Sequence, residues 1–418
     1  MIEWNDQQKM IRETVRKFVE AEIVPQLEEL EHGDRPPYDV LRKMFKTFGM
    51  DELGGSRFDR QIAREEAGLT SKGEPQASKA EKKQPPSASD RADAAAMQLI
   101  PLIELSRFCP GMVTALGVSM GLTAASIMSK GTLEQKKRWA RELLTLEKIG
   151  SWAITEPGSG SDAFGSMMST ARRTEDGGYL LNGNKTFITN GPYADTIVFI
   201  CKLEEADVDP ADRKVLTFVL DRGMEGLTQS RPLRKMGCHS SPTGELFLQD
   251  VKVDVDRLLG GSETGSGGRQ GAKDTFSMER SGVAAMAYGI VDRCLELSVA
   301  YAKERVQFGK PIGEFQLIQD KLARMVVARM NIENMLFRFI ESAGAGRGLS
   351  FAEASAMKLY SARAATEVAL EAVQIHGGNG YMSEYQVEQL ARDAKVLQIY
   401  AGTDEIQISA IARDLLAT

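Results

Sequence analysis

The sequence predicts an α+β protein that is mainly α, with a helical N-terminal part, a small β-rich middle part and a helical C-terminal part. Two patterns support this fold class. Apolar residues recur at helical spacing before about residue 150 and after about residue 270, whereas short β-rich runs separated by Gly, Asn, Asp and Pro occupy about 151–260. Because 418 residues exceed one compact core, we expect domains at 1–150, 151–260 and 261–418.

The N-terminal part contains helical patterns on either side of a polar segment. Helical spacing is seen in two groups of apolar residues: Ile11, Val15, Phe18 and Val19, then Leu41, Met44 and Phe45. Residues 51–95 are instead rich in Lys, Glu, Pro, Ser and Ala, which predicts a flexible insertion, either a surface loop or a regulatory segment. Helical patterning resumes near Ala96 and runs through Leu144.

The middle part contains three β-rich runs, at residues 198–201, 216–220 and 245–251. Turn-forming residues separate these runs, so we expect a small β domain. A glycine-rich linker at 261–271 follows it.

The C-terminal part is predicted to be helical. One long helix is indicated by a single apolar stripe, which comprises Val283, Met286, Ile290, Cys294, Leu297 and Tyr301. Further helices are expected at about 315–343, 351–375 and 384–416, with breaks at the glycines between them.

Composition excludes several classes of function. A net charge of -6 gives no broad attraction for nucleic acid or for an anionic membrane surface. The four cysteines are far apart and the three histidines lack metal-ligand spacing, so neither a disulfide framework nor a metal site is expected. We find no signal peptide and no apolar run approaching the roughly 20 residues of a membrane span, and expect a cytoplasmic protein.

A glycine-rich loop at 153–165 (AITEPGSGSDAFG) is the first candidate site. It places Thr155, Ser159 and Ser161 among three glycines, which provide hydrogen-bond donors and allow close backbone approach. Such a loop suits a polar ring or a phosphate, although an ordinary turn at a strand edge has the same composition. Phosphate-binding GxxxxGK[ST] and nucleophilic GxSxG motifs are absent from the sequence.

The same loop resembles the first signature of the acyl-CoA dehydrogenase family. Further family motifs follow in order: FITNG at 187–191, SPTGE at 241–245, RVQFGK at 305–310, QIHGGNG at 374–380 and IYAGTDEIQ at 399–407. The resemblance covers the chain outside 51–95. It implies a β-barrel-like middle domain, a C-terminal four-helix bundle and FAD as cofactor. It also implies dehydrogenation of an acyl-CoA to the trans-2-enoyl-CoA, as in fatty-acid β-oxidation, with electrons passed to an electron-transferring flavoprotein.

The resemblance further implies a homodimer or homotetramer, because in the family a neighbouring subunit grips one end of the FAD. Thr155 would contact the pyrimidine side of the flavin, and Thr189 would lie near its N5. The FAD-binding residues carried over are Trp152, Ile154, Thr155, Gly160, Ser161, Phe187, Thr189, Arg305, Phe308, Phe315, Gln316, Gln374, Ile375, Gly377, Gly378, Thr403 and Glu405. The substrate-binding residues carried over are Ser161, Phe276, Arg280, Tyr400 and Gly402. Gln389 replaces the usual Lys or Arg of the second signature and is expected to affect only a surface pair.

The catalytic base is the main departure. Many family members carry a glutamate directly after the tyrosine of the C-terminal loop, where this sequence has Ala401 after Tyr400. Glu279, directly before Arg280, matches the isovaleryl- and long-chain subgroup, whose base lies on the long helix. A first-turn glutamate that complements the helix dipole is the alternative reading. Burial beside flavin should raise the pKa of Glu279. An acyl-CoA oxidase and a non-catalytic flavin- or CoA-binding protein are the competing functions.

Overall fold

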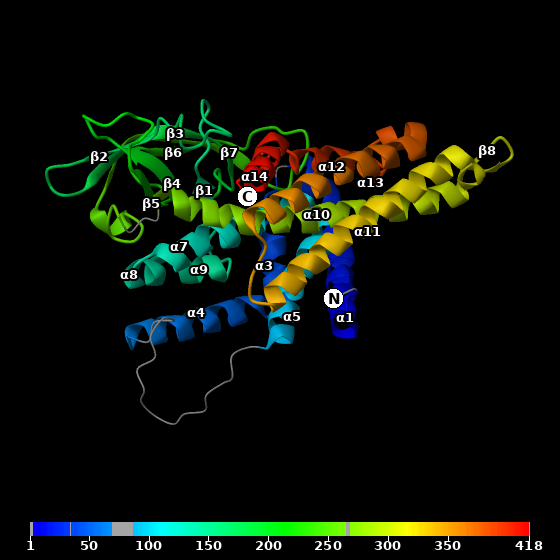
Figure 1. The fold of residues 1–418 in the computed structure, drawn as a ribbon, viewed down its shortest axis with the longest axis horizontal. Helices are drawn as coiled ribbons and strands as arrows, with labels where there is room; N and C mark the ends of the chain where they lie inside the picture. Colours follow the sequence, from blue (N-terminus) through cyan, green and yellow to red (C-terminus); the bar gives the residue numbers. More distant parts are fainter. Residues whose placement is uncertain (1–2, 34, 69–86, 265–267, 418) are drawn as a thin grey trace, which may run out of the picture.

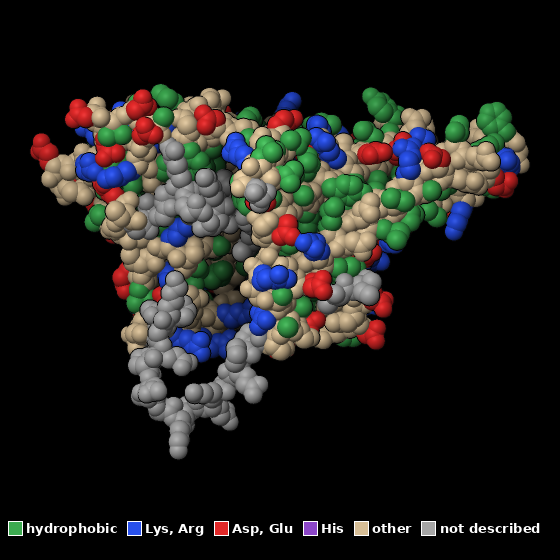
Figure 2. Space-filling view, in the orientation of Figure 1, with side chains coloured by type: hydrophobic (Ala, Val, Ile, Leu, Met, Phe, Trp, Pro, Cys, Tyr) green, Lys and Arg blue, Asp and Glu red, His purple; other side chains and the backbone are tan. Residues whose placement is uncertain are grey.

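The computed structural model describes residues 3–33, 35–68, 87–264 and 268–417, with side chains described from Glu279 onward in the last range. Figure 1 shows the sheet at one end of the molecule and the long C-terminal helices running away to the other end, with the N-terminal helices below both. Charged side chains of both signs are interspersed over the face in Figure 2, consistent with the modest net charge.

The N-terminal part is helical, as predicted. Its helices are α1 (Asp6–Phe18), α2 (Leu27–His32), α3 (Tyr38–Thr47), α4 (Met50–Glu66), α5 (Ala88–Ser106), α6 (Pro110–Leu116), α7 (Ala125–Lys130), α8 (Leu133–Gln135) and α9 (Arg141–Leu144). Asn5 forms a capping box that starts α1, and Val15 and Phe18 turn inward from it. The apolar periodicity therefore identified the core-facing side of this helix.

The prediction that residues 51–95 form a flexible insertion is wrong for the part of this segment that the structure describes. Helix α4 runs to Glu66 and buries Phe58 and Ile62 against the sheet-side cluster. Helix α5 starts at Ala88, where Ser87 and Asp90 form a capping box. Buried apolar residues therefore order α4 within a polar stretch, and a capping box fixes the start of α5. The rest of the predicted insertion, 69–86, lies outside the described residues.

A second expectation, that no apolar run approaches the length of a membrane span, is also wrong. Pro110–Lys130 has the length and hydropathy of such a span. In the structure this stretch comprises α6, a π-helical segment (Gly117–Ala124) and α7, and 61% of its most apolar window is buried inside the protein. Its apolar character is therefore that of a core helix, which packs beside β1 (Gly150–Ala153).

The middle part forms one seven-stranded mixed sheet, ordered β1-β4-β2-β3-β7-β6 with β5 paired to β4. Its strands are β1, β2 (Thr170–Arg173), β3 (Tyr179–Thr189), β4 (Thr196–Leu203), β5 (Val215–Asp221), β6 (Leu227–Gln229) and β7 (Thr243–Val253). The three predicted β runs fall in β4, β5 and β7. Strand β4 is buried on both faces because Phe199 faces one apolar cluster and Val198 the other. The sheet is open: within the described residues it does not close into a barrel.

The C-terminal part is a helical bundle. It consists of α10 (Gly268–Glu304), α11 (Gln316–Gly344), α12 (Phe351–His376), α13 (Gln386–Val396) and α14 (Asp404–Leu416), with a small hairpin of β8 (Val306–Gln307) and β9 (Lys310–Pro311) between α10 and α11. The long helix is confirmed, although it begins inside the predicted glycine linker. The single helix expected at 384–416 is wrong, because Ala401 and Gly402 adopt positive φ values and separate α13 from α14.

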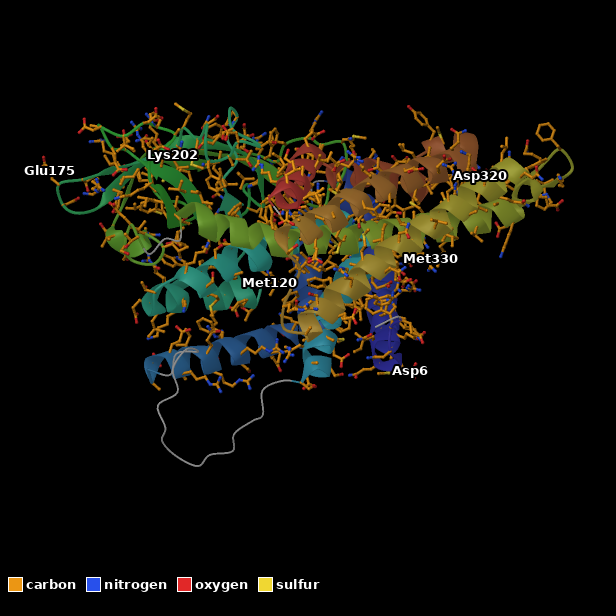
Figure 3. All side chains as sticks on the ribbon, in the orientation of Figure 1. Asp6, Met120, Glu175, Lys202, Asp320 and Met330 are labelled. Carbon is orange, nitrogen blue, oxygen red and sulfur yellow. The ribbon has the colours of Figure 1, made fainter. Side chains whose placement is uncertain are left out.

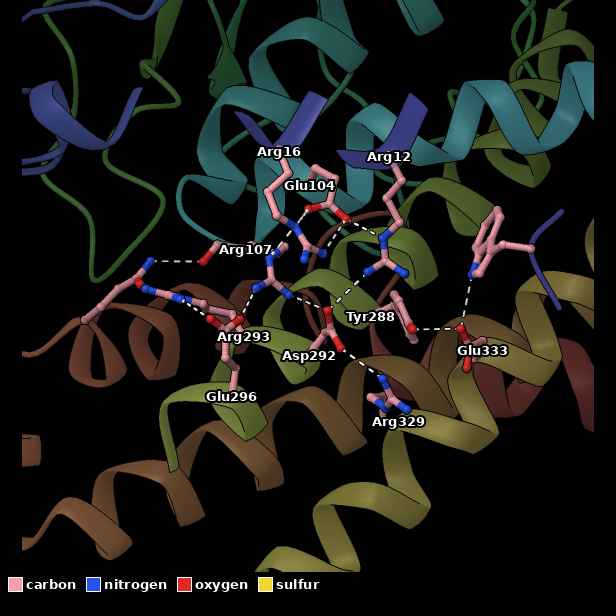
Figure 4. A network of polar contacts seen from close by, with 12 residues as sticks. Arg12, Arg16, Glu104, Arg107, Tyr288, Asp292, Arg293, Glu296, Arg329 and Glu333 are labelled. Carbon is pink, nitrogen blue, oxygen red and sulfur yellow. Dashed lines mark hydrogen bonds and ion pairs between the residues drawn. The ribbon is translucent and has the colours of Figure 1, made fainter. Parts of the chain in front are cut away.

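An ion-pair network joins the first helices to the bundle (Figure 4). The buried carboxylate of Glu104 forms ion pairs with Arg12 and Arg16, and Arg16 Nε lies 2.8 Å from Glu104 Oε2. Asp292 on α10 pairs with Arg12, Arg107 and Arg329. Because several cations share the buried Glu104 and the partly buried Asp292, the network fixes α1 and α5 against α10 and α11.

Candidate functional site

The glycine-rich loop leaves the end of β1 and lies against the end of β3. The amide of Thr186 donates to the carbonyl of Thr155 at 2.9 Å, which places the loop beside Phe187 and Thr189. Phe187 has a positive φ of 56° and its side chain is 69% exposed. An exposed aromatic ring on a residue with a strained backbone conformation is typical of a ligand-binding surface.

A buried ion pair anchors this loop. Lys185 Nζ lies 2.8 Å from Glu156 Oε1 and also donates to the carbonyl of Ile154 at 3.0 Å. Glu156 accepts two further bonds, from the amides of Met168 and Ser169. Burial lowers the pKa of Lys185, and for Glu156 it is outweighed by Lys185 and the amide donors, so the pKa of Glu156 is also lowered. The loop is thus tied at its start.

A second buried lysine ties the far end of the loop. Lys202, which Figure 3 places in the sheet, donates from Nζ to the carbonyl of Gly165 at 2.9 Å. Ser159, expected as a ligand donor, instead turns inward and donates to the carbonyl of Asp162 at 2.7 Å. The two lysines and this hydroxyl make the loop rigid without using its open side.

The open side of the loop fits a planar polar ring. Within the described residues, the hydroxyls of Thr155, Ser161 and Thr189 have no side-chain hydrogen bond to protein. A Cβ added at Gly158 or Gly160 would meet nothing within 4 Å. Free hydroxyls beside open space and an exposed aromatic ring are the donor set that an isoalloxazine requires. Trp152 and Ile154 are buried at the base of this surface.

Asn190 supports the loop and was not singled out from the sequence. Its Nδ2 donates to the carbonyls of Ala115 and Gly150 at 2.9 Å, and its Oδ1 accepts from the hydroxyl of Tyr38 at 3.0 Å. It also adopts a φ of 62°. Asn190 therefore joins α3, α6, β1 and β3 directly behind the loop. The sequence signal was a polar Asn-Gly pair at the end of a strand.

The second group of predicted cofactor residues lies far from the first in this chain. Arg305, Phe308, Phe315 and Gln316 surround the β8–β9 hairpin, which Figure 1 places at the opposite end of the molecule from β1. Phe308 is 92% exposed and contacts Phe315 edge-on.

A glycine cradle lies at the same end of the bundle. Gln374, Gly377 and Gly378 are exposed at the end of α12, Ile375 is buried, and His376 stacks on Tyr301 of α10 with ring centroids 4.3 Å apart. Gly377 has a φ of 59°, and a Cβ at either glycine would meet nothing within 4 Å. Backbone can therefore approach a ligand closely here.

Glu279 lies on α10 and is partly exposed. Burial raises the pKa of Glu279 to about 7, against the opposing effect of Arg280 and Lys358. Its charge also contributes to a raised pKa of Tyr400, whose hydroxyl lies 3.4 Å from the sulfur of Met286. Glu279 on α10 and Tyr400 in the loop before α14 therefore interact electrostatically.

Arg280, expected to bind substrate, is turned toward α12. Its guanidinium carbon lies 3.8 Å from the centre of the Phe351 ring, and Nη1 donates to Ser355 Oγ at 3.0 Å. The side chain of Phe276, also expected at the substrate site, lies outside the described residues.

The C-terminal loop has Ala401 in place of a carboxylate directly after Tyr400. Ala401 has a φ of 55° and Gly402 a φ of 86°. The carbonyl of Gly402 accepts from Lys358 Nζ and from Gln407 Nε2, both at 2.8 Å. Thr403 caps α14, and Glu405 is exposed in its first turn.

Lys358 was missed by the sequence reasoning. It is a lysine on an otherwise small and apolar face of the helix at 351–376, and that irregularity was the available signal.

The expectation that Gln389 affects only a surface pair is wrong. Its side chain is buried, and Nε2 donates to the carbonyl of Phe108 at 2.8 Å and to Asp393 Oδ2 at 3.1 Å. The α13 face that carries it packs against the protein rather than against solvent. An amide satisfies buried acceptors there without the cost of burying a charge.

The chain matches three family models along its length: Acyl-CoA dehydrogenase, N-terminal domain at residues 5–61, middle domain at 151–251, and C-terminal domain at 266–416. It is 34% identical to a 3-(aryl)acrylate reductase of Clostridium sporogenes over 99% of each chain. Among solved structures it is similar to butyryl-CoA dehydrogenase from Megasphaera elsdenii, with a TM-score of 0.80, 31% identity and full coverage of both chains. It is also similar to a glutaryl-CoA dehydrogenase from Mycobacterium smegmatis in complex with FADH2, with a TM-score of 0.81, 25% identity and coverage of 99% and 96%.

Proposed function

Because the chain belongs to the acyl-CoA dehydrogenase family, an FAD-binding family of oxidoreductases, we propose that it oxidises a CoA thioester to the trans-2-enoyl thioester, with Glu279 as the catalytic base. The position of Glu279 carries this proposal. It combines partial exposure, a pKa of about 7 and proximity to the Tyr400 loop, in which Ala401 cannot accept a proton.

The chemistry divides between the residues of the chain and its cofactor. The Glu279 carboxylate accepts the proton from the carbon α to the thioester, which needs an anionic oxygen in a site from which water is largely removed. FAD, when bound, supplies the acceptor for the hydride that leaves the β carbon. Phe187 and the hydroxyls of Thr155 and Thr189 orient the flavin ring, while Glu156 and Lys185 keep their loop rigid.

The distant residues are proposed to serve a second copy of the chain. Arg305, Gln374 and Gly377 lie at the end of the bundle away from the glycine-rich loop, so one chain alone does not bring them to its own flavin ring. An arginine that neutralises the pyrophosphate and a glycine that admits it closely would fit that end of FAD. This supports at least a homodimer.

The electron acceptor is proposed to be an electron-transferring flavoprotein, with oxygen as the alternative. Reduced enzyme would be mixed with this flavoprotein under anaerobic conditions and, separately, with dissolved oxygen. Rapid reoxidation by the flavoprotein with little hydrogen peroxide supports a dehydrogenase. Stoichiometric peroxide with no transfer would assign an oxidase instead.

The base is tested by anaerobic titration of the FAD-loaded enzyme with butyryl-, isovaleryl- and palmitoyl-CoA, following flavin bleaching. We expect Glu279→Gln to keep its FAD but to be bleached at least about a thousandfold more slowly, because the amide cannot take the proton. Glu384→Gln, on an exposed turn, is the matched control and should bleach at the wild-type rate. Near-normal bleaching of Glu279→Gln would remove Glu279 from the role of base.

A further inference from the structure

Lys358 is an unusual residue within the helical bundle. Its side chain is completely buried on α12, although lysines are seldom fully buried. Its Nζ donates to the carbonyl of Gly402 at 2.8 Å and lies 3.8 Å from Asp404 Oδ1. Burial lowers the pKa of Lys358 to about 8, with Arg280 lowering it and Asp404, Glu279 and Glu405 raising it.

Lys358 lies on the face of α12 that packs against α10 beside Glu279. Ser355, three residues earlier and therefore on the same face, accepts the hydrogen bond from Arg280. The electrostatic interaction of Lys358 with Glu279 affects the pKa of both groups. One ammonium group thus contacts the C-terminal loop at Gly402 and also acts electrostatically on Glu279.

The hydrogen bond alone does not require a charge. Gln407, a neutral donor, already reaches the same Gly402 oxygen at 2.8 Å. Nor is Lys358 the sole cation beside Asp404, since Arg363 Nε lies 2.9 Å from its other oxygen. What Lys358 adds is a positive charge inside the bundle, close to Glu279.

We propose that Lys358 is a positioning residue for this reaction: its ammonium group fixes the Gly402 carbonyl opposite the base and favours the ionised form of Glu279. The inference rests on the proposed function, because it takes Glu279 as the base. Arg280, Lys358 and Tyr400 are the titratable groups that act on Glu279 among the described side chains. Arg280 also acts on Glu279, but its guanidinium is bonded to Ser355 and stacked on Phe351, so Lys358 is the cation of this pair that also contacts the loop.

Neutral and charged substitutions of Lys358 separate the effect of its charge on Glu279 from the effect of its hydrogen bond to Gly402. Lys358→Met and Lys358→Gln remove the charge, so they should raise the pKa of Glu279 and move the acidic limb of the bleaching rate by about one pH unit to higher pH. At pH values on the acidic side of this limb, flavin bleaching in the variants would be about tenfold slower than in the wild type. Above pH 8, where Lys358 itself loses its proton, the difference in bleaching rate should shrink. Lys358→Arg keeps the charge and should leave the limb in place.

A direct titration gives a second readout. The infrared carbonyl band of protonated Glu279, identified by its loss in Glu279→Gln, would be followed against pH in FAD-loaded enzyme without substrate. We expect its midpoint to rise by the same one pH unit in both neutral variants. Arg363→Met, which removes the exposed cation from Asp404, is the control and should leave the midpoint unchanged.

The outcomes distinguish the inference from the proposed function. An unshifted midpoint and an unshifted acidic limb in the neutral variants, at normal FAD content, would overturn the role of Lys358 while leaving Glu279 as the base. Full activity of Glu279→Gln would instead overturn the base. Should Lys358→Met fail to fold, Lys358→Gln carries the same test.

Discussion

The buried ion pair of Lys185 and Glu156, which anchors the glycine-rich loop, gives a specific prediction about stability. Lys185 and Glu156 are both almost completely buried and their charged atoms are 2.8 Å apart. We expect Lys185→Met to be strongly destabilising, because it leaves the Glu156 carboxylate in the interior with only the amides of Met168 and Ser169 as donors. Two amide donors do not replace an ammonium group that also binds the carbonyl of Ile154.

The magnitude follows from the cost of an unpaired buried charge. Removing one partner of a buried pair typically costs about 3–5 kcal/mol. The double variant Glu156→Gln with Lys185→Met removes both charges and should recover about half of that loss, since an amide can still accept from the two backbone donors. Both variants should lose FAD more readily than the wild type, because the loop between Ile154 and Gly165 is released at its start.

The pH dependence provides an independent check of the same reasoning. In the wild type the folded-state pKa of Glu156 is lowered, so its contribution to stability is present above the unfolded pKa of about 4.3 and is lost as pH falls. In Lys185→Met the pKa of Glu156 should instead be raised. Protonation then relieves the buried charge, so the variant should recover part of its lost stability between about pH 7 and pH 5.

Urea midpoints and thermal unfolding at several pH values, with FAD content measured alongside, test these expectations. Lys214→Met, which removes a lysine from an exposed ion pair in the same part of the protein, is the control and should change stability by less than about 1 kcal/mol. A Lys185→Met protein as stable as the wild type, or a double variant no more stable than the single one, would refute the assignment of the cost to an unpaired carboxylate.

Two further predictions concern Gln389 and Gly402. Gln389→Leu should lower the free energy of unfolding by about 1–3 kcal/mol, since the Phe108 carbonyl and Asp393 lose their donor; an unchanged urea midpoint would contradict this. Gly402→Ala should slow flavin bleaching at unchanged FAD content, because the added Cβ would lie 2.8 Å from Gln407 Nε2 at a φ of 86°. Wild-type bleaching in that variant would show that the loop conformation has little effect on the reaction.

Much of the architecture was predictable because it depends on local periodicity. The stripe from Val283 to Tyr301 identified α10, and the short β-rich runs identified β4, β5 and β7, since each pattern marks residues that must be buried. The errors arose where few residues decide the outcome. Phe58 and Ile62 order α4 within a polar segment, and two positive φ values divide the last predicted helix.

The candidate site was predictable to the extent that short motifs carry it. The glycine-rich loop, the aromatic Phe187 of the FITNG motif and the presence of Ala401 where a carboxylate is common are all readable in the sequence. The supports of these residues were not readable. Asn190 joins four elements, and Lys358 reaches Gly402 across 44 positions of the chain.

The sequence by itself determined the family and the order of helical and β-rich parts, and it offered Glu279 as the candidate base. Only the tertiary structure decided which polar side chains are buried and paired. Gln389 illustrates the difference: as a residue on a helix it could face water or protein, and packing against Phe108 and Asp393 settles which. The physical reason is that desolvation and ion pairing depend on neighbours that are close in space but distant along the chain, so no local pattern encodes them.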